Sequence, residues 1–233
     1  MIVSANQPFF APYPGFFEKA LLSDVFVLLD TVQFPRGTTW TSRNRFKNDQ
    51  GTLWLTVPVQ RKGLGLQALD RVRICQEEKW IRKHLSSLAA AYQKAPFFSD
   101  HFRFLESTYN RLPERLIDLN LLIITYLFRE LRISTRIIHL SELGIRSRGT
   151  RLLLDICKSL GSRHFLAQRS AGKHLDAALF RENEIELQLF QVKKPVYPQL
   201  WGPFLDNLSA FDLLFTCGPR AGEYILDHSA IIQ

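Results

Sequence analysis

The first thirty residues restrict the fold more than any other part of the chain. Two short apolar runs, residues 2–5 (IVSA) and 25–30 (VFVLLD), are typical of strands buried in a parallel sheet. Between them, residues 15–23 (GFFEKALLS) have the apolar spacing of a helix. Strand, helix and strand in this order form a βαβ unit, because parallel neighbours need a crossover connection. The sequence therefore predicts an α/β protein.

The remaining chain interrupts this pattern and then returns to it. Residues 38–76 contain two alternating runs, 52–59 and 70–76, which predict a hairpin-like part. Residues 77–131 have helical spacing throughout, and from residue 134 onward strand-like and helix-like segments alternate again. We therefore expect one α/β domain over residues 1–233. Its parallel or mixed central sheet has flanking helices, a β-hairpin insertion and a helical insertion at about 77–131.

Residues 6–17 (NQPFFAPYPGFF) concentrate three prolines and a glycine directly after the first predicted strand. Ligands of α/β sheets bind beyond the carboxyl ends of the strands, and a helix that begins there offers free N–H groups to an anion. We predict that Gln7 and Tyr13 contact substrate by hydrogen bonds, and that Gly15 permits close backbone approach. The structural alternative is a loop that only closes the sheet edge with aromatic rings.

Basic residues are concentrated in two segments of a chain whose net charge is +8. Residues 36–73 carry eight arginines and lysines against two aspartates, and residues 146–173 carry seven against one aspartate. This distribution favours phosphates or other anions as ligands. The loop at 168–173, with Arg169 and Ser170, is expected to join residues 6–16 and 30–45 in one crevice. Scattered, solvated arginines are the alternative interpretation.

Four further residues are candidates for chemistry. Arg43 and Asn44 lie in a polar stretch that suits a strand core poorly, so we expect them to bind the anionic or polar group of a substrate. His84, on a helical stripe, is a candidate general base, with a partly buried structural histidine as the alternative. Asp30 ends the second predicted strand and is a candidate catalytic carboxylate, or else a turn cap.

The sequence also restricts the cellular location of the protein and the kinds of cofactor that it can bind. Three widely spaced cysteines exclude a disulfide scaffold and favour a reducing cytoplasm. No apolar run is long enough to span a membrane, and no basic region precedes a signal-peptide core. We find no metal-ligand spacing, Walker A loop or Rossmann glycine fingerprint, which leaves any cofactor unknown.

Several motifs in fixed order resemble those of the WbqC-like family. They are QPFFAPYPGFF, LLDTVQF, WTSRNRF and LWLTVPV in the first half, and LLLDICKSLGSRHFLAQRSAGKHLD and PVYPQLWGPFLDNLSAFDLLFTCG in the second. The resemblance implies a bacterial protein associated with O-antigen or other surface-polysaccharide gene clusters. It further implies a transferase that moves glycine or another aminoacyl group to an activated sugar. The implied partner is a phosphate-bearing small molecule, either a nucleotide sugar or an activated amino acid.

The opening also has a weaker likeness to the nucleotidyltransferase superfamily that uses a His-x-x-His loop. This chain has Tyr13-Pro14-Gly15-Phe16 at the place of the two histidines, so their transition-state stabilisation is absent. A non-catalytic or nucleotide-binding protein on that scaffold is therefore the alternative function. A tRNA-contacting protein is the other, since the basic charge and four tryptophans suit RNA, although no known RNA-binding module is present.

Overall fold

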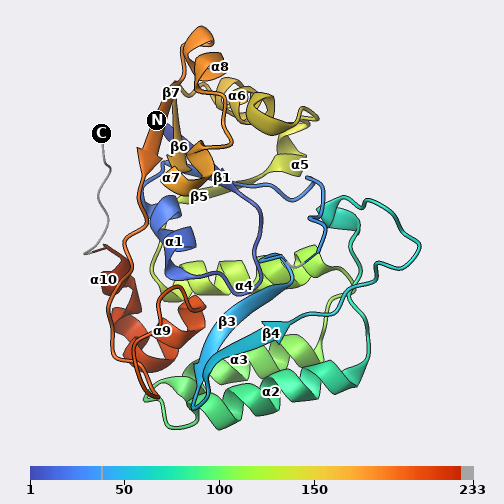
Figure 1. Cartoon of the computed structure of the whole chain (residues 1–233), viewed down its shortest axis with the longest axis vertical. Coiled ribbons are helices and arrows are strands. Elements are labelled where there is room, and N and C mark those ends of the chain that lie inside the picture. The colour runs from blue at the N-terminus through green and yellow to red at the C-terminus, as the bar shows by residue number, and fades with distance from the viewer. Residues whose placement is uncertain (38, 227–233) are drawn as a thin grey trace.

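A central sheet of five parallel strands organises the computed structural model, which describes residues 1–37 and 39–226. The strands run in the order β5-β2-β1-β6-β7 (Figure 1). Their bounds are β1 Ile2–Asn6, β2 Val25–Leu28, β5 Arg136–His139, β6 His164–Gln168 and β7 Glu186–Phe190. The predicted α/β class is confirmed, and the sheet is parallel rather than mixed.

The strand order contains one reversal of direction. From β1 the chain moves to β2 and then β5 on one side, and it returns to place β6 and β7 on the other side. The register pairs Val3 with Val25 on β2 and with Phe165 on β6. The reversal therefore lies between β1 and β6, and in open α/β sheets this is the place where ligands bind, outside the carboxyl ends of the strands.

Helices cover both faces of the sheet because successive strand residues point to opposite sides. On β2, Val25 and Val27 belong to one apolar core, whereas Phe26 and Leu28 belong to the other. The first core includes α5 Leu140–Leu143, α6 Gly149–Ser159 and α8 Ala177–Glu182. The second includes α1 Pro14–Leu21 and α4 Leu116–Glu130, and α1 and α4 lie between the sheet and the hairpin in Figure 1.

The insertion between β2 and β5 supplies a second layer. It contains the antiparallel hairpin of β3 Arg43–Asn48 and β4 Gly51–Thr56, followed by α2 Glu78–Tyr92, α3 Phe98–Asn110 and α4. The predicted hairpin insertion and helical insertion are both present, and the helices begin and end within one residue of the predicted 77–131. The hairpin pairs residues 43–48 with 51–56, however, and not the run 52–59 with 70–76. The prediction of an alternating strand at 70–76 was wrong. This segment contains the 3-10 turn η1 Leu69–Arg71 and then only isolated bridges, because its amides pair with separate segments.

The C-terminal part returns to the hairpin layer. After β6 come α7 Arg169–Gly172, α8 and β7, and then α9 Ala210–Cys217, η2 Gly218–Arg220 and α10 Ala221–Leu226. Ser209 caps α9 by accepting a hydrogen bond from the amide of Phe211, as its position predicts. The Asp212 carboxylate on the same helix is fully buried and accepts a 2.7 Å hydrogen bond from the Tyr92 hydroxyl.

No helix among the described residues has both the length and the apolar character needed to cross a bilayer.

Candidate functional site

The first loop, residues 7–13, leaves β1 at the reversal point and has no regular secondary structure. Its buried carbonyls need donors from elsewhere in the protein. Asn44 on β3 supplies two of them, since its side-chain nitrogen donates to the carbonyls of Phe10 at 3.0 Å and Ala11 at 2.8 Å. Asn44 is completely buried, so we revise its predicted role. Its side chain holds the first loop in position from within the protein interior.

A second buried asparagine completes the support of the first loop. Asn120 on α4 donates to the carbonyls of Pro8 at 2.9 Å and Thr41 at 2.8 Å. At the far end of the loop, the amide of Ala210 donates to the carbonyl of Pro12 at 2.8 Å. The loop therefore takes its shape from the hairpin, from α4 and from the start of α9, rather than from its prolines alone.

A basic pocket of about 560 Å³ opens beside the first loop, at the carboxyl ends of β6 and β7. Segments from four parts of the chain meet there: the end of the first loop, the hairpin region, the β6–α7 junction and the coil after β7. The lining residues are Tyr13, Trp40, Arg45, Gln168, Arg169, Ser170, Lys173, Gln191, Val192, Lys194 and Asn207. The predicted residues Tyr13, Arg169 and Ser170 thus lie in one pocket.

Among the described residues, the lining contains four cationic side chains and no carboxylate. Arg45 is held in place by hydrogen bonds to the carbonyls of Asp206 and Asn207, and Lys194 forms an ion pair with Asp206. Within residues 1–37 and 39–226, Arg169 and Lys173 form no ion pair. Their charges are available to an anion, since no carboxylate of the described residues neutralises them.

Neutral hydrogen-bonding groups accompany these charges. The Tyr13 hydroxyl donates to Gln168 Oε1 at 3.3 Å and so connects the first loop with the end of β6. Burial raises the pKa of Tyr13, which keeps the hydroxyl protonated and able to donate. Ser170 adds a second hydroxyl to the lining.

A buried ammonium group lies close to the reversal point. Lys19 on α1 donates to the carbonyl of Ala5 at 2.6 Å and approaches Asn6 Oδ1 at 3.4 Å, both at the carboxyl end of β1. Burial lowers the pKa of Lys19 to about 8. The group is still mainly protonated at neutral pH, so it adds a positive charge behind the first loop.

The strap, residues 191–194, forms one wall of the basic pocket and packs on the start of α1. A Cβ atom added to Gly15 would lie 2.5 Å from Val192 Cγ1 and 2.6 Å from the Tyr13 ring. Gly15 therefore has the predicted role of permitting close approach, but the approaching group is the strap and not a substrate. Three residues further along the same helix, the Glu18 carboxylate accepts a hydrogen bond from the amide of Lys193 at 3.2 Å.

Glu18 should make stability depend on pH. Burial raises the pKa of this carboxyl from 4.5 to about 7, against the opposing effect of the Lys193 amide. The folded state therefore holds the proton more tightly than the unfolded state, and the free energy of unfolding falls as pH rises from 4.5 to 7. We expect Glu18→Gln to remove this fall and to stabilise the protein at pH 8 by about 2 kcal/mol.

Urea unfolding at pH 5, 6, 7 and 8 measures the effect of Glu18→Gln. The matched control is Glu182→Gln, because Glu182 is an exposed glutamate on α8. It should reproduce the pH dependence of the unsubstituted protein. Identical pH dependence in both variants would contradict the assignment to Glu18.

A row of two tryptophan and two arginine side chains lies along the hairpin and enters the basic pocket at one end. The Arg43 guanidinium lies 3.5 Å from the Trp54 ring centre, the Trp54 and Trp40 rings are 5.8 Å apart, and the Arg45 guanidinium lies 5.8 Å from Trp40. We call these four side chains the Trp–Arg row. Arg43, predicted to bind substrate, belongs to this row and lines neither the basic pocket nor the cavity described next.

A second cavity, of about 570 Å³, lies at the carboxyl ends of β1, β2 and β5. Its lining residues are Gln7, Thr31, Val32, Gln33, Leu66, Gln67, Ala68, Leu140, Ile145, Arg146, Ser147, Arg148, Gly149 and Leu152. The prediction of one crevice shared by residues 6–16, 30–45 and 168–173 is confirmed in part, because Tyr13, Trp40, Arg45 and Arg169 all line the basic pocket. Gln7 and the residues directly after β2 line the second cavity instead, so they do not share that crevice.

The two residues predicted to be catalytic line neither cavity. Asp30 is buried, and its carboxylate accepts hydrogen bonds from the Ser141 amide at 3.0 Å and hydroxyl at 2.6 Å, which caps the start of α5. His84 is buried against Trp80 and lies 3.2 Å from the Tyr109 hydroxyl, and burial lowers its pKa to about 4. Their placement matches the structural alternatives of a turn cap and a core histidine.

Several pocket residues escaped the sequence analysis. Arg45 was recognisable, because it lies two positions after Arg43 and so projects from the same face of the strand. Lys194 and Asn207 lie in an irregular proline-rich stretch with no periodicity to place them. The only sequence signal for Gln168 was its position at the end of a strand-like segment. Over the residues the structure describes, no group of three or more metal-ligating side chains occurs, and the three cysteines are free.

The profile of the WbqC-like protein family matches residues 7–224, which includes every lining residue of the basic pocket and of the second cavity. The chain belongs to the WbqC-like family. This WbqC-like chain is also similar to "Uncharacterized protein Rv1507c" of Mycobacterium tuberculosis, with 30% identity over 227 residues that cover 96% of each chain. No solved structure matches it.

Proposed function

We propose that this WbqC-like protein is a transferase that binds a phosphate-bearing substrate in the basic pocket. One observation carries the proposal: four cationic side chains from separate segments converge on a pocket whose lining has no carboxylate. The pocket also lies beside the reversal point of the sheet, where α/β proteins bind ligands. Convergent positive charge of this kind attracts and holds phosphate.

Each part of the lining has a role in this proposal. Arg169 and Lys173 bind the phosphate oxygens, because they line the pocket and form no ion pair within the described residues. Arg45, which is anchored by two carbonyls, fixes the orientation of the substrate. Tyr13 and Ser170 offer hydroxyl donors to the phosphate or to the transferred group. Asn44, Asn120 and Gly15 act indirectly, by holding the first loop and the strap in position.

The family supports a finer proposal. We propose a cytoplasmic role in surface-polysaccharide biosynthesis, in which glycine or another aminoacyl group is transferred to an activated sugar. The activated donor and the sugar acceptor both carry phosphate in such a reaction, and a basic pocket suits either of them. A protein that binds such a molecule without transferring a group is the alternative, and a transfer assay with labelled glycine distinguishes the two.

Substitution of Arg169 should identify the pocket as the binding site. Losing one charge-assisted hydrogen bond typically costs about 1.5–3 kcal/mol, so we expect Arg169→Ala to weaken binding about 10- to 100-fold. Calorimetric titration measures this with nucleotide sugars, aminoacyl-adenylate analogues and tRNA as probes. Tight, salt-dependent binding of tRNA without binding of the small molecules would favour the RNA alternative.

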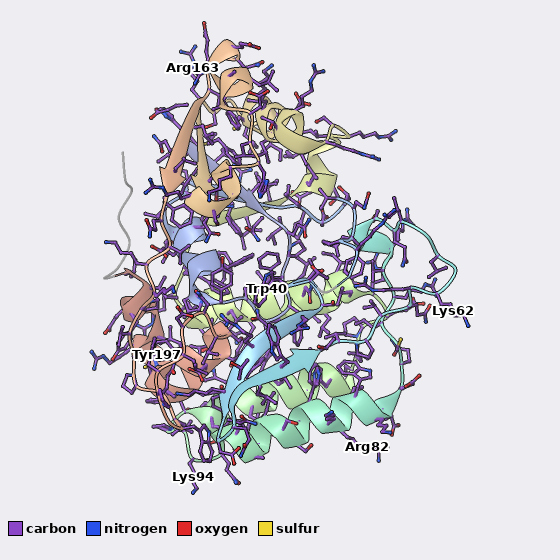
Figure 2. All side chains as sticks on the ribbon, viewed as in Figure 1. Trp40, Lys62, Arg82, Lys94, Arg163 and Tyr197 are labelled. Carbon is purple, nitrogen blue, oxygen red and sulfur yellow. The ribbon has the colours of Figure 1, made fainter. Side chains whose placement is uncertain are left out.

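The chain offers a matched control on the same strand. Arg163 directly precedes β6 and Arg169 directly follows it, so the two arginines occupy opposite ends of one strand. Figure 2 shows Arg163 at one extreme of the molecule, far from Trp40, which lines the pocket. Arg163→Ala should leave affinity unchanged. Equal losses in both variants would mean that binding depends on net charge alone and would overturn the assignment of the pocket.

A further inference from the structure

The Trp–Arg row exposes more aromatic surface than the fold requires. Trp40 and Trp54 are 39% and 43% exposed, although tryptophan is usually well buried in proteins. Trp54 projects from the outer face of β4, where its neighbours Leu53 and Leu55 carry the contacts with the core. Packing against the core therefore does not explain why tryptophans occupy these positions. An exposed aromatic group of this kind marks an interaction site.

The two indole rings of the row are not parallel, and each leaves part of its surface exposed. The Trp40 and Trp54 ring planes are inclined by 36°, with centres 5.8 Å apart, so the rings diverge and do not cover each other fully. Arg43 and Arg45 lie at the two ends of the row, over Trp54 and Trp40 respectively. Aromatic and guanidinium planes are the groups on which proteins stack nucleobases.

The row is continuous with the basic pocket. Trp40 and Arg45 belong to both, whereas Trp54 and Arg43 extend the row beyond the pocket lining. A ligand with a flat ring at one end and phosphate at the other could therefore contact the row and the free cations Arg169 and Lys173 together. Nucleotides have this distribution of groups.

We propose that the Trp–Arg row is a nucleobase-stacking site and that the ligand of the basic pocket is a nucleotide. The proposal rests on the proposed function, since it assigns the phosphates to the basic pocket, and it narrows the substrate to molecules that carry a nucleobase. A bare sugar phosphate or an aminoacyl phosphate would leave the row unused.

The experiment compares probes that share phosphate but differ in the ring. Adenosine, uridine and guanosine diphosphates, inorganic pyrophosphate and glucose 1-phosphate are titrated against the unsubstituted protein and against Trp54→Thr and Trp40→Leu. Base stacking on an aromatic side chain typically strengthens binding about tenfold or more. We therefore expect at least one nucleoside diphosphate to bind about tenfold more tightly than pyrophosphate, and Trp54→Thr to reduce this ratio.

Tryptophan fluorescence gives an independent readout. The nucleotide should quench the emission of Trp40 and Trp54, and quenching should persist in Trp80→Phe and Trp201→Phe. Trp80 and Trp201 instead donate hydrogen bonds to the carbonyls of Cys75 and Ala91.

The outcomes separate this inference from the proposed function. If pyrophosphate binds and every nucleoside diphosphate binds equally well, the stacking site is wrong while the basic pocket stands. Equal binding of glucose 1-phosphate and the nucleotides would also overturn it, because the stacked ring would then be a sugar. If no probe binds, both proposals fail.

Discussion

Asn120→Leu is expected to lower the free energy of unfolding by about 3 kcal/mol, because two buried carbonyls lose their donor at once. The Asn120 side-chain amide donates hydrogen bonds to the carbonyls of Pro8 in the first loop and Thr41 before the hairpin. No part of Asn120 is exposed to solvent. Leucine has the same number of side-chain heavy atoms as asparagine and a similar branched shape, so the substitution leaves no cavity that could account for the loss. Urea unfolding at constant pH measures it.

A control variant and a variant of the second buried asparagine test whether the lost stability comes from the support of the first loop. Asn110→Leu, at the exposed end of α3, should change stability by no more than about 0.5 kcal/mol. Asn44→Ala should also destabilise the protein, since it leaves the carbonyls of Phe10 and Ala11 unpaired. The double variant should lose less than the two single losses together, because both asparagines hold the same loop. Strictly additive losses would show that the two asparagines act independently.

Gly15→Ala is expected to destabilise the protein by about 3 kcal/mol and to abolish ligand binding in the basic pocket. The new methyl group would overlap Val192 and the Tyr13 ring, which both line the pocket. A loss of stability in Gly15→Ala would be informative, because helix propensity alone predicts a gain. Alanine is a better helix former than glycine by about 0.5–1 kcal/mol. A net loss must therefore come from the displaced neighbours.

A second substitution tests this cause. Val192→Ala removes both methyl groups that the new side chain would meet on the strap. We expect Gly15→Ala/Val192→Ala to recover more than half of the lost stability, and part of the binding as the Tyr13 ring rotates aside. Thermal unfolding and calorimetric titration of all three variants provide the comparison. If Gly15→Ala binds ligand normally, the contact between α1 and the strap does not shape the pocket.

The fold could be predicted because its signals are local. The apolar runs of β1 and β2 and the helical spacing between them lie within thirty residues, and that spacing alone defines a parallel βαβ unit. The helical insertion could be placed within one residue for the same reason. Residues 70–76 were misread because alternating burial does not distinguish a paired strand from a chain that contacts successive neighbours. Val72 and Ile74 are both fully buried without forming a ladder.

The site was less predictable because it depends on contacts between distant segments. Tyr13, Arg169 and Ser170 were found through the rule that strand ends carry ligands. Asn44 was misread because its polarity suggested exposure, whereas its amide pairs with carbonyls of a loop more than thirty residues earlier. His84 illustrates the same limit, since a helical stripe does not reveal whether a cavity adjoins it.

The anchoring of the first loop has a consequence for the order in which the protein forms. Asn120 is synthesised more than a hundred residues after the loop that it supports, and the amide that holds Pro12 belongs to Ala210. Contacts between such distant positions are slow to form, because long stretches of chain must close before they yield any stabilisation. The β1–α1–β2 unit can assemble during synthesis, whereas the ligand pocket matures only when the segment from the strap to α9 has docked. A nascent or truncated chain would thus carry the fold of the sheet without a competent binding site.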